Sequence, residues 1–282
     1  MSFAGNHVAV HFAIIQSTGA SSARRPAFFA DAIMLVQSSR SGHLLHLTIN
    51  RPEKRNALNG ELCRELCDGI DAGDADPDVH AILLTANGKS FCAGMDLAEI
   101  AGALMEEADA AEIDRVQERL FTAGAWVSTP IIAGVHAAAL AGGTGLVANC
   151  HIVVAGEAAT FGLTEVRLGL WPFLVFRACA AAMGERRTME LSLTGRIFSA
   201  DEARSFGLVH EVAADAQARA AEIAQQVAAF SAFAMRKGMS AVHQSVGKSW
   251  QAAGELARQA RKEVFHSPEF REGIRKWATR ES

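Results

Sequence analysis

The chain has 282 residues, of which 50% are hydrophobic and 21% are charged, with a formal net charge of −4 and a pI near 6.2. This length suffices for a full hydrophobic core without disulfides or metals. The acidic balance argues against a nucleic-acid partner, and the apolar runs are too short for a membrane span. Five cysteines without a paired framework favour a reducing compartment. We therefore expect a cytoplasmic protein that binds neither nucleic acid nor membrane.

The first 33 residues show no clear periodicity. They mix Gly, Ser and Ala, are poor in acidic residues and include the turn Arg24-Arg25-Pro26. This composition is similar to a transit peptide, which would place the protein in mitochondria, or translation starts at Met34 instead. We expect an accessory or disordered extension over 1–33, a core over 34–213 and a C-terminal helical region over 214–282.

Strands alternate with helices along the first half of the chain. The patterns predict strands over 43–50, 80–86, 131–135 and 152–155, and helices over 60–72, 110–127 and 142–150. Asn59 is a typical N-cap for the first of these helices, and Thr129-Pro130 ends the second. Beyond Phe173 the pattern is almost wholly helical, with a break over 208–212. This order of elements predicts an α/β core followed by amphipathic helices.

Two glycine-bearing segments are the strongest chemical signal. They are Phe91–Leu97 (FCAGMDL) and Ala139–Gly145 (ALAGGTG), and each places backbone N–H groups where a turn leads into a helix. Neither has the spacing of a dinucleotide fingerprint or a Walker phosphate loop. If the fold brings them together, two such amides would form an oxyanion hole, which stabilises an oxygen that gains negative charge.

Several ordered motifs resemble the crotonase family, the enoyl-CoA hydratase/isomerase superfamily. Besides the two glycine segments they are Ile49–Asn59 (INRPEKRNALN), Ala155–Glu157 (AGE), Phe161–Glu165 (FGLTE) and Leu193–Arg196 (LTGR). The similarity extends over roughly 34–277. It implies an α/β crotonase-like spiral of ββα units with a C-terminal helical trimerisation region, assembled as a homotrimer or a dimer of trimers. It also implies an acyl-CoA thioester substrate, with coenzyme A present only as part of that substrate and no separate cofactor.

The resemblance assigns roles to individual residues. The oxyanion-hole amides fall on Met95 and Gly142, and the group that exchanges a proton with the substrate falls on Glu165. Coenzyme A would be held near six positions, the last two in a neighbouring subunit's pocket: Arg55, Ala57, Lys89, Ala93, Phe265 and Lys276. Arg55 and Lys89 can also be interpreted as ordinary surface charges.

One residue of the family pattern is missing. Members that hydrate an enoyl-CoA use two glutamates, and the first of them would fall on position 145, which is Gly145. A single glutamate beside an oxyanion hole still suffices to move a proton from one carbon to another. We therefore expect double-bond isomerisation by Glu165. The alternatives are a hydratase or related acyl-CoA lyase with a non-standard water-activating group, and a non-catalytic coenzyme A-binding paralogue.

Other polar groups have simpler interpretations. We expect His136, at a strand end, to be structural and Asp96 to cap the following helix. Glu118 could face the acyl pocket. Three aromatic residues either shape that pocket or belong to the core: Trp171, Phe173 and Phe176. Cys63 and Cys67 lie four residues apart without further ligands nearby, so we expect small core residues and no metal site.

Overall fold

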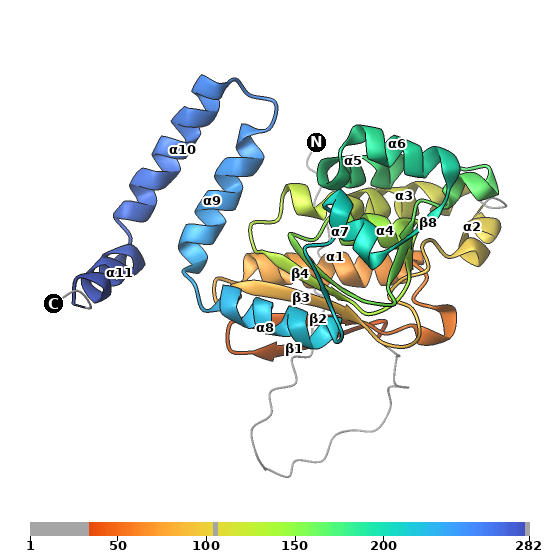
Figure 1. The fold of residues 1–282 in the computed structure, drawn as a ribbon, viewed down its shortest axis with the longest axis horizontal. Helices are drawn as coiled ribbons and strands as arrows, with labels where there is room; N and C mark the ends of the chain where they lie inside the picture. The colour runs from red at the N-terminus through yellow and green to blue at the C-terminus, as the bar shows by residue number, and fades with distance from the viewer. Residues whose placement is uncertain (1–33, 104–106, 280–282) are drawn as a thin grey trace, which may run out of the picture.

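A six-stranded sheet forms the centre of the fold (Figure 1). The computed structural model describes residues 34–103 and 107–279. The sheet has the order β1-β2-β3-β4-β6-β9 and is parallel except for the β1–β2 pair. Its strands are β1 (Val36–Ser41), β2 (Leu44–Ile49), β3 (Ala81–Ala86), β4 (Ile131–Val135), β6 (Ile152–Gly156) and β9 (Glu211–Ala213). Every residue of β3 and β4 is buried, as expected for parallel strands covered on both faces.

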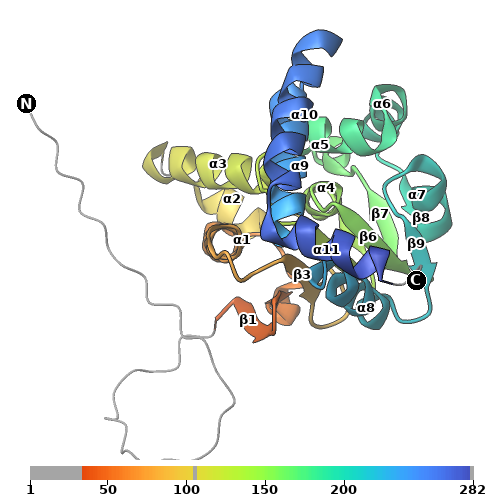
Figure 2. The same cartoon turned by 90° about the vertical axis from the view of Figure 1, so that its left-hand side faces the viewer.

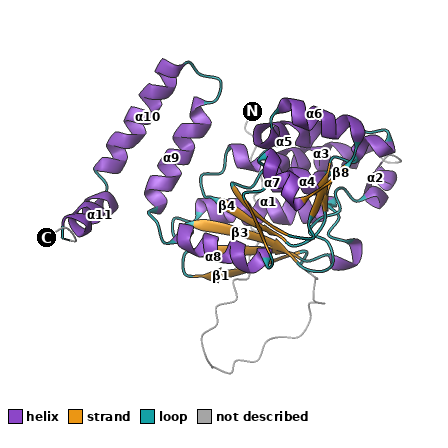
Figure 3. Cartoon of the chain, viewed as in Figure 1, coloured by secondary structure: helices purple, strands orange, loops and turns teal. Residues whose placement is uncertain are grey.

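A second, smaller sheet receives the chain as it leaves strands of the large sheet. It contains β5 (Ala139–Leu140), β7 (Thr160–Gly162) and β8 (Ile197–Ser199). Isolated parallel bridges extend it, one between Cys92 and Ala139 and one between Leu58 and Met95. After β2, β3, β4 and β6, the chain therefore passes through a short strand or bridge of this second layer and then enters a helix (Figure 3). The repetition is a spiral of ββα units.

Helices cover both faces of the large sheet. α1 (Gly60–Ala75) begins at Asn59, whose side chain accepts a hydrogen bond from the Leu62 N–H, and it buries Cys63 and Cys67 in the core as predicted. On the opposite face lies α8 (Ala216–Ala228) (Figure 1). It packs four alanines at four-residue spacing against the sheet: Ala216, Ala220, Ala224 and Ala228.

The remaining helices of the body follow the second sheet. They are α2 (Leu97–Ala103), α3 (Glu107–Phe121), α4 (Gly142–Ala148), α5 (Phe173–Met183), α6 (Glu185–Thr194) and α7 (Ala200–Phe206). Three short 3₁₀ turns connect elements: η1 (Pro52–Lys54), η2 (Ala123–Ala125) and η3 (Glu165–Leu168). No helix in the part of the chain that the structure describes is long and apolar enough to cross a membrane.

Three C-terminal helices form an arm that extends from the body (Figures 1 and 2). They are α9 (Ala232–Ser245), α10 (Trp250–Phe265) and α11 (Pro268–Ala278), and none of their residues is buried. The Arg236 guanidinium fastens α9 to the end of α1, because it donates hydrogen bonds to the carbonyls of Asp74, Asp76 and Val79. Apolar side chains on the arm remain exposed, and Trp250 is 96% exposed.

The structure corrects three sequence predictions. β1 has a mostly exposed, polar sequence and was not predicted, and the region expected to be wholly helical beyond residue 173 contains β8. The helix expected over 110–127 runs from Glu107 to Phe121. Beyond it the chain turns into η2, where Gly124 packs so closely on Asn149 that an added Cβ would lie 2.5 Å from the Asn149 carbonyl oxygen.

Candidate active site

The two glycine segments lie against each other. The Leu140 N–H donates to the Cys92 carbonyl over 2.9 Å, which joins the start of one segment to the other. Gly94 adopts a φ of 95°, and a Cβ there would lie 2.9 Å from the Leu140 oxygen and 3.4 Å from the Gly142 nitrogen. A side chain at position 94 would therefore push the segments apart, so this close approach needs glycine.

Two backbone N–H groups remain free where the segments meet. Leu58 pairs with the residues on either side of Met95: its N–H donates to the Gly94 carbonyl over 2.7 Å, and its own carbonyl accepts from Asp96 over 3.0 Å. The Met95 N–H therefore points away from this bridge, and it has no acceptor among the described residues. Gly142 is the first residue of α4, and its N–H likewise has no acceptor within residues 34–103 and 107–279.

Backbone strain precedes the second amide. Ala141 has φ 51° and ψ −119°, a backbone conformation that residues other than glycine rarely adopt. The surrounding structure holds it there, since the Ala141 N–H donates to the Gly162 carbonyl over 2.7 Å. The Thr144 hydroxyl donates to the Ala139 carbonyl over 2.7 Å, which closes the same turn from the other side. The strained residue thereby sets the direction of the next peptide group, which carries the Gly142 N–H.

Met95 and Gly142, the residues that carry these amides, line a cavity of about 570 Å³, and Glu165 lines it as well. This volume lies within the range of small-molecule sites. The walls come from α2, α3 and the segment from Leu170 to Val175, and they are mainly apolar. The aromatic residues expected to shape an acyl pocket do so in two cases: Trp171 and Phe173 line the cavity, whereas Phe176 stacks on Trp171 with 6.1 Å between ring centroids.

Glu165 is a partly buried carboxylate at the start of η3, shortly after β7. Its Oε2 atom is buried and has no hydrogen-bond partner in the described part of the chain. Burial raises the pKa of this carboxyl above its ordinary value of 4.5, and a hydrogen bond from its own backbone N–H opposes the shift more weakly. A carboxylate that lies in a cavity with a raised pKa and no cationic partner is well suited to accept and return a proton.

Position 145 has no room for a side chain. A Cβ built on Gly145 would lie 2.1 Å from Cγ1 and 2.4 Å from Cβ of Val175, and 3.5 Å from Cδ1 of Phe121. α5 therefore packs directly on α4 where the family's first glutamate would stand. The sequence has no carboxylate at position 145, and the Val175 side chain fills the space that one would need.

Asn56 joins the segment that carries Arg55 and Ala57 to the segment that carries Lys89. It is fully buried, and its side-chain amide donates to the carbonyls of Asn87 and Ser90 over 2.8 and 2.9 Å. Its side-chain oxygen accepts from the Arg51 N–H over 2.8 Å. The residue stands at φ 56°, in the left-handed region that asparagine tolerates better than most residues.

Four of the predicted coenzyme A residues lie on these turns. The Ala93 N–H donates to the Arg55 carbonyl over 3.0 Å, so the two segments are in direct contact. Ala57 is partly buried, and Arg55 and Lys89 are exposed. None of the four lines the cavity. Their side chains and backbone groups border an accessible surface outside it.

The two C-terminal residues of the prediction lie elsewhere. Phe265 stacks on Phe270 with centroids 4.7 Å apart, and Lys276 lies 3.9 Å from Glu272. Their helices, α10 and α11, are at the opposite end of the molecule from α2 in Figure 1, and α2 borders the cavity. The chain does not bring Phe265 or Lys276 to its own cavity, so a role in a neighbour's pocket stays a prediction.

Three further polar candidates are His136, Asp96 and Glu118. His136 Nε2 donates to the Gly88 carbonyl over 2.9 Å and its Nδ1 lies 3.0 Å from Gln217 Nε2, so this residue is structural, as expected. Asp96 caps α2 by accepting from the Ala98 N–H over 3.0 Å, which confirms its predicted role. Glu118 lines the cavity and is exposed to solvent.

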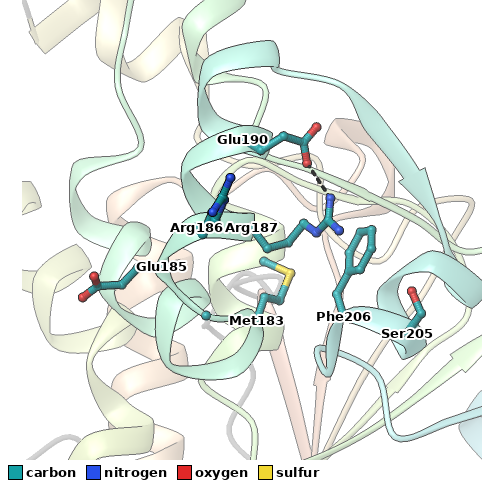
Figure 4. A pocket seen from close by; sticks show the side chains of 8 residues that line it. Met183, Glu185, Arg186, Arg187, Glu190, Ser205 and Phe206 are labelled. Carbon is teal, nitrogen blue, oxygen red and sulfur yellow. Dashed lines mark hydrogen bonds and ion pairs between the residues drawn. The ribbon is translucent and has the colours of Figure 1, made fainter.

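A second hollow, of about 600 Å³, lies where α5, α6 and α7 meet (Figure 4). One of its arginines is paired within the hollow. Arg187 forms an ion pair with Glu190 over 3.1 Å, and the Arg187 guanidinium lies 4.2 Å from the centre of the Phe206 ring. It contains neither of the free amides nor Glu165. We therefore place the active site in the cavity lined by Glu165. Among the described residues, no cluster of His, Cys, Asp and Glu is arranged to hold a metal ion.

Sequence reasoning proposed only Glu118 from the α3 wall of the site and missed three of its neighbours. Ile113, Gln117 and Phe121 line the cavity from α3. They are spaced four residues apart and therefore share one helix face, a periodic signal that was available in the sequence. Val175 was missed as well, because nothing in the sequence pairs it with Gly145.

The fold and the site define a class. A spiral of ββα units with two free amides and a carboxylate in one apolar cavity is the architecture of the crotonase-like acyl-CoA enzymes. A family model described as enoyl-CoA hydratase/isomerase matches residues 39–282. The chain belongs to the enoyl-CoA hydratase/isomerase family.

Individual relatives agree with this assignment. A protein of Thermus thermophilus, provisionally named as an enoyl-CoA hydratase, is 34% identical over 83% of this chain and 94% of its own length. An enoyl-CoA hydratase of Mycobacterium tuberculosis is 33% identical over 85% of this chain and 91% of the relative. The crystal structure of an enoyl-CoA hydratase from Bacillus anthracis superposes with a TM-score of 0.82 at 28% identity, covering 87% of this chain and 96% of that one.

Proposed function

We propose that this protein moves the double bond of an enoyl-CoA thioester, with Glu165 as the single proton-transferring group. The thioester oxygen accepts hydrogen bonds from the Met95 and Gly142 N–H groups. Glu165 removes a proton from a carbon of the acyl chain, and the electron pair of that C–H bond shifts toward the thioester, which becomes an enolate. The protonated Glu165 then returns the proton to another carbon of the same chain, so the double bond moves and the atoms balance.

Each part of the site has a physical share in this reaction. The two amides stabilise the enolate oxygen, and one such donor contributes about 10²–10³ in rate. A positioned general base contributes about 10²–10⁴. The raised pKa of Glu165 suits both proton transfers, because the group must be a base in one step and an acid in the next. The mainly apolar walls suit the hydrocarbon part of an acyl chain.

The observation that carries the proposal is the contact between Gly145 and Val175. Hydration needs a group that holds and activates water, and the position of the first family glutamate is occupied by the Val175 side chain. Isomerisation needs one carboxylate and two amide donors, and the residues proposed for these roles, Glu165, Met95 and Gly142, all line the cavity. The residues present therefore support isomerisation best.

Hydration is the second candidate, and a specific residue favours it. Relatives such as the Mycobacterium tuberculosis protein are named as hydratases, and Glu118 lines the cavity from α3. Its exposed carboxylate offers a place for a water molecule that Gly145 cannot hold.

The test uses the purified protein with matched 2-enoyl- and 3-enoyl-CoA thioesters in oxygen-18 water, with products identified by mass spectrometry. A displaced double bond without added oxygen supports isomerisation. Labelled 3-hydroxyacyl-CoA would establish hydration, and loss of that label in E118Q would identify the water-activating group. If no thioester is converted although all of them bind, the protein is a coenzyme A-binding paralogue.

We also propose how the thioester and the subunits are held. Arg55 and Lys89 would attract the phosphates of coenzyme A, while the backbone near Ala57 and Ala93 contacts its other parts. The arm supports assembly into a homotrimer or a dimer of trimers, because none of its helical residues is buried within the chain. In such an assembly Phe265 and Lys276 would complete a neighbour's pocket. Light scattering after size exclusion tests the assembly, and a monomer at micromolar concentration would refute it.

A further inference from the structure

The cavity contains a second polar group whose hydrogen-bonding capacity is unused. Gln117 lines the cavity from α3, and only 3% of the residue is exposed. Its side-chain nitrogen Nε2 is buried and has no acceptor among the residues that the structure describes. Buried amides in folded proteins are nearly always paired, so an unpaired one in a ligand cavity points to a partner supplied by the ligand.

The neighbours of Gln117 do not supply that partner. Ile113 and Phe121, one helical turn to either side on the same wall, are apolar. If the amide group is rotated, its oxygen occupies the buried position and its nitrogen takes the place of the oxygen. A hydroxyl group both donates and accepts, so it pairs with Gln117 in either orientation.

The position of Gln117 places the partner atom along the acyl chain. Phe121 marks the thioester end of the cavity, because a Cβ on Gly142 would lie 3.1 Å from its ring atom Cζ. Gln117 lies four residues earlier on α3, about 6 Å along the helix axis. An atom that reaches Gln117 therefore lies about one helical turn from the thioester end of the cavity, so we assign it to the acyl chain beyond the thioester.

We propose that Gln117 determines specificity by hydrogen bonding a hydroxyl group on the distal part of the acyl chain, so that the substrate is a hydroxylated acyl-CoA rather than a plain hydrocarbon one. This inference rests on the proposed acyl-CoA function and narrows its substrate class. An aliphatic analogue would leave the buried amide unpaired, and sites built to bind a substrate hydroxyl reject such analogues strongly.

The experiment measures binding, so it does not depend on turnover. Saturated thioesters are used as unreactive probes: 4-hydroxybutanoyl-, 5-hydroxypentanoyl- and 6-hydroxyhexanoyl-CoA, each compared with the aliphatic thioester of the same length by isothermal titration calorimetry. At one chain length the full-length protein should bind the hydroxylated probe at least about tenfold more tightly. Q117L and Q117M should lose that preference and bind the aliphatic probe at least as tightly as the parent protein does.

A variant far from the cavity serves as the control, and the results that contradict this inference differ from those that contradict the proposed function. Q226L, a matched change on the exposed face of α8, should keep the preference. Equal binding of both probes at all three lengths, or a preference that survives in both Gln117 variants, overturns this inference and leaves the proposed function standing. If neither series binds, the proposed function fails and this inference fails with it.

Discussion

Val175 fills the space that a side chain on Gly145 would need, since a Cβ on that glycine would lie 2.1 Å from Val175 Cγ1. The two residues belong to α5 and α4, which pack against each other, and α4 begins at the free amide of Gly142. Two positions have therefore become adapted to each other, and the glycine is part of the packing rather than a simple gap in the chemistry. Restoring a carboxylate at position 145 would require changing both residues.

This contact predicts coupling between substitutions. G145A should destabilise the protein by about 1–3 kcal/mol through overpacking, and V175A should destabilise it by leaving a cavity. V175A removes the Cγ1 contact at 2.1 Å but keeps the Cβ at 2.4 Å, so it relieves only part of the overpacking. G145A/V175A should therefore be more stable than the sum of the single effects by about 1 kcal/mol, as measured by urea unfolding. G238A in α9, where an added Cβ meets nothing within 4 Å, is the matched control and should be additive with V175A. Additivity in both pairs would contradict the contact.

Glu165 should be essential for turnover and dispensable for binding. E165Q preserves the shape of the side chain and removes its basicity, so the isomerisation rate should fall by about 10²–10⁴-fold. Affinity for a saturated acyl-CoA should change little, because the amides and the coenzyme A turns are untouched. Steady-state kinetics and calorimetry measure the two effects. E185Q on the exposed start of α6 is the control, and a similar loss in both variants would show that the charge has no specific role.

The buried carboxylate should also affect stability in a pH-dependent way. Because burial raises the pKa of Glu165 in the folded state, the folded protein binds this proton more tightly than the unfolded chain. The contribution of Glu165 to the free energy of unfolding is therefore fully present below the unfolded pKa near 4.5. It is lost as the pH rises through the folded pKa. E165Q should be more stable than the wild type at neutral pH, and the difference should vanish near pH 4. Thermal unfolding from acidic to neutral pH tests this, and an equal gain at every pH would argue against it.

The strain at Ala141 predicts an unusual response to glycine. A141G should raise the free energy of unfolding by about 1 kcal/mol, because a side chain at this φ and ψ costs about 1–3 kcal/mol and glycine relieves it. A218G in α8 is an exposed helical control and should lower stability by about 1 kcal/mol. Equal destabilisation in both variants would mean that Ala141 is not strained.

Much of the fold was predictable because its central strands are continuous apolar runs between clear turn signals. β3 and β4 match their predicted ranges closely, and Asn59 starts α1 as expected. β1 and β8 were not predicted, because they are short or exposed and owe their strand conformation to the partner strands they pair with. Tertiary pairing of this kind leaves little trace in local sequence.

Parts of the candidate site were also predictable from the sequence, and other parts were not. The glycine segments and Glu165 stand in ordered motifs, so sequence reasoning could propose that Met95, Gly142 and Glu165 meet, and all three line one cavity. The strain at Ala141 and the contact of Val175 with Gly145 depend on how the helices pack. Residue type alone gives no sign of either.

The wall of the cavity carries a consequence for spectroscopy. The chain contains four tryptophans and no tyrosine, so its absorption at the indole band and the fluorescence excited there come from tryptophan, without energy transfer from phenol rings. Trp171 stands in the cavity wall, stacked on Phe176, whereas Trp126, Trp250 and Trp277 are exposed. Emission from the exposed three is open to aqueous quenchers, and that of Trp171 is the part that an acyl group would shield. The protein therefore carries a native optical reporter in the wall of its candidate active site.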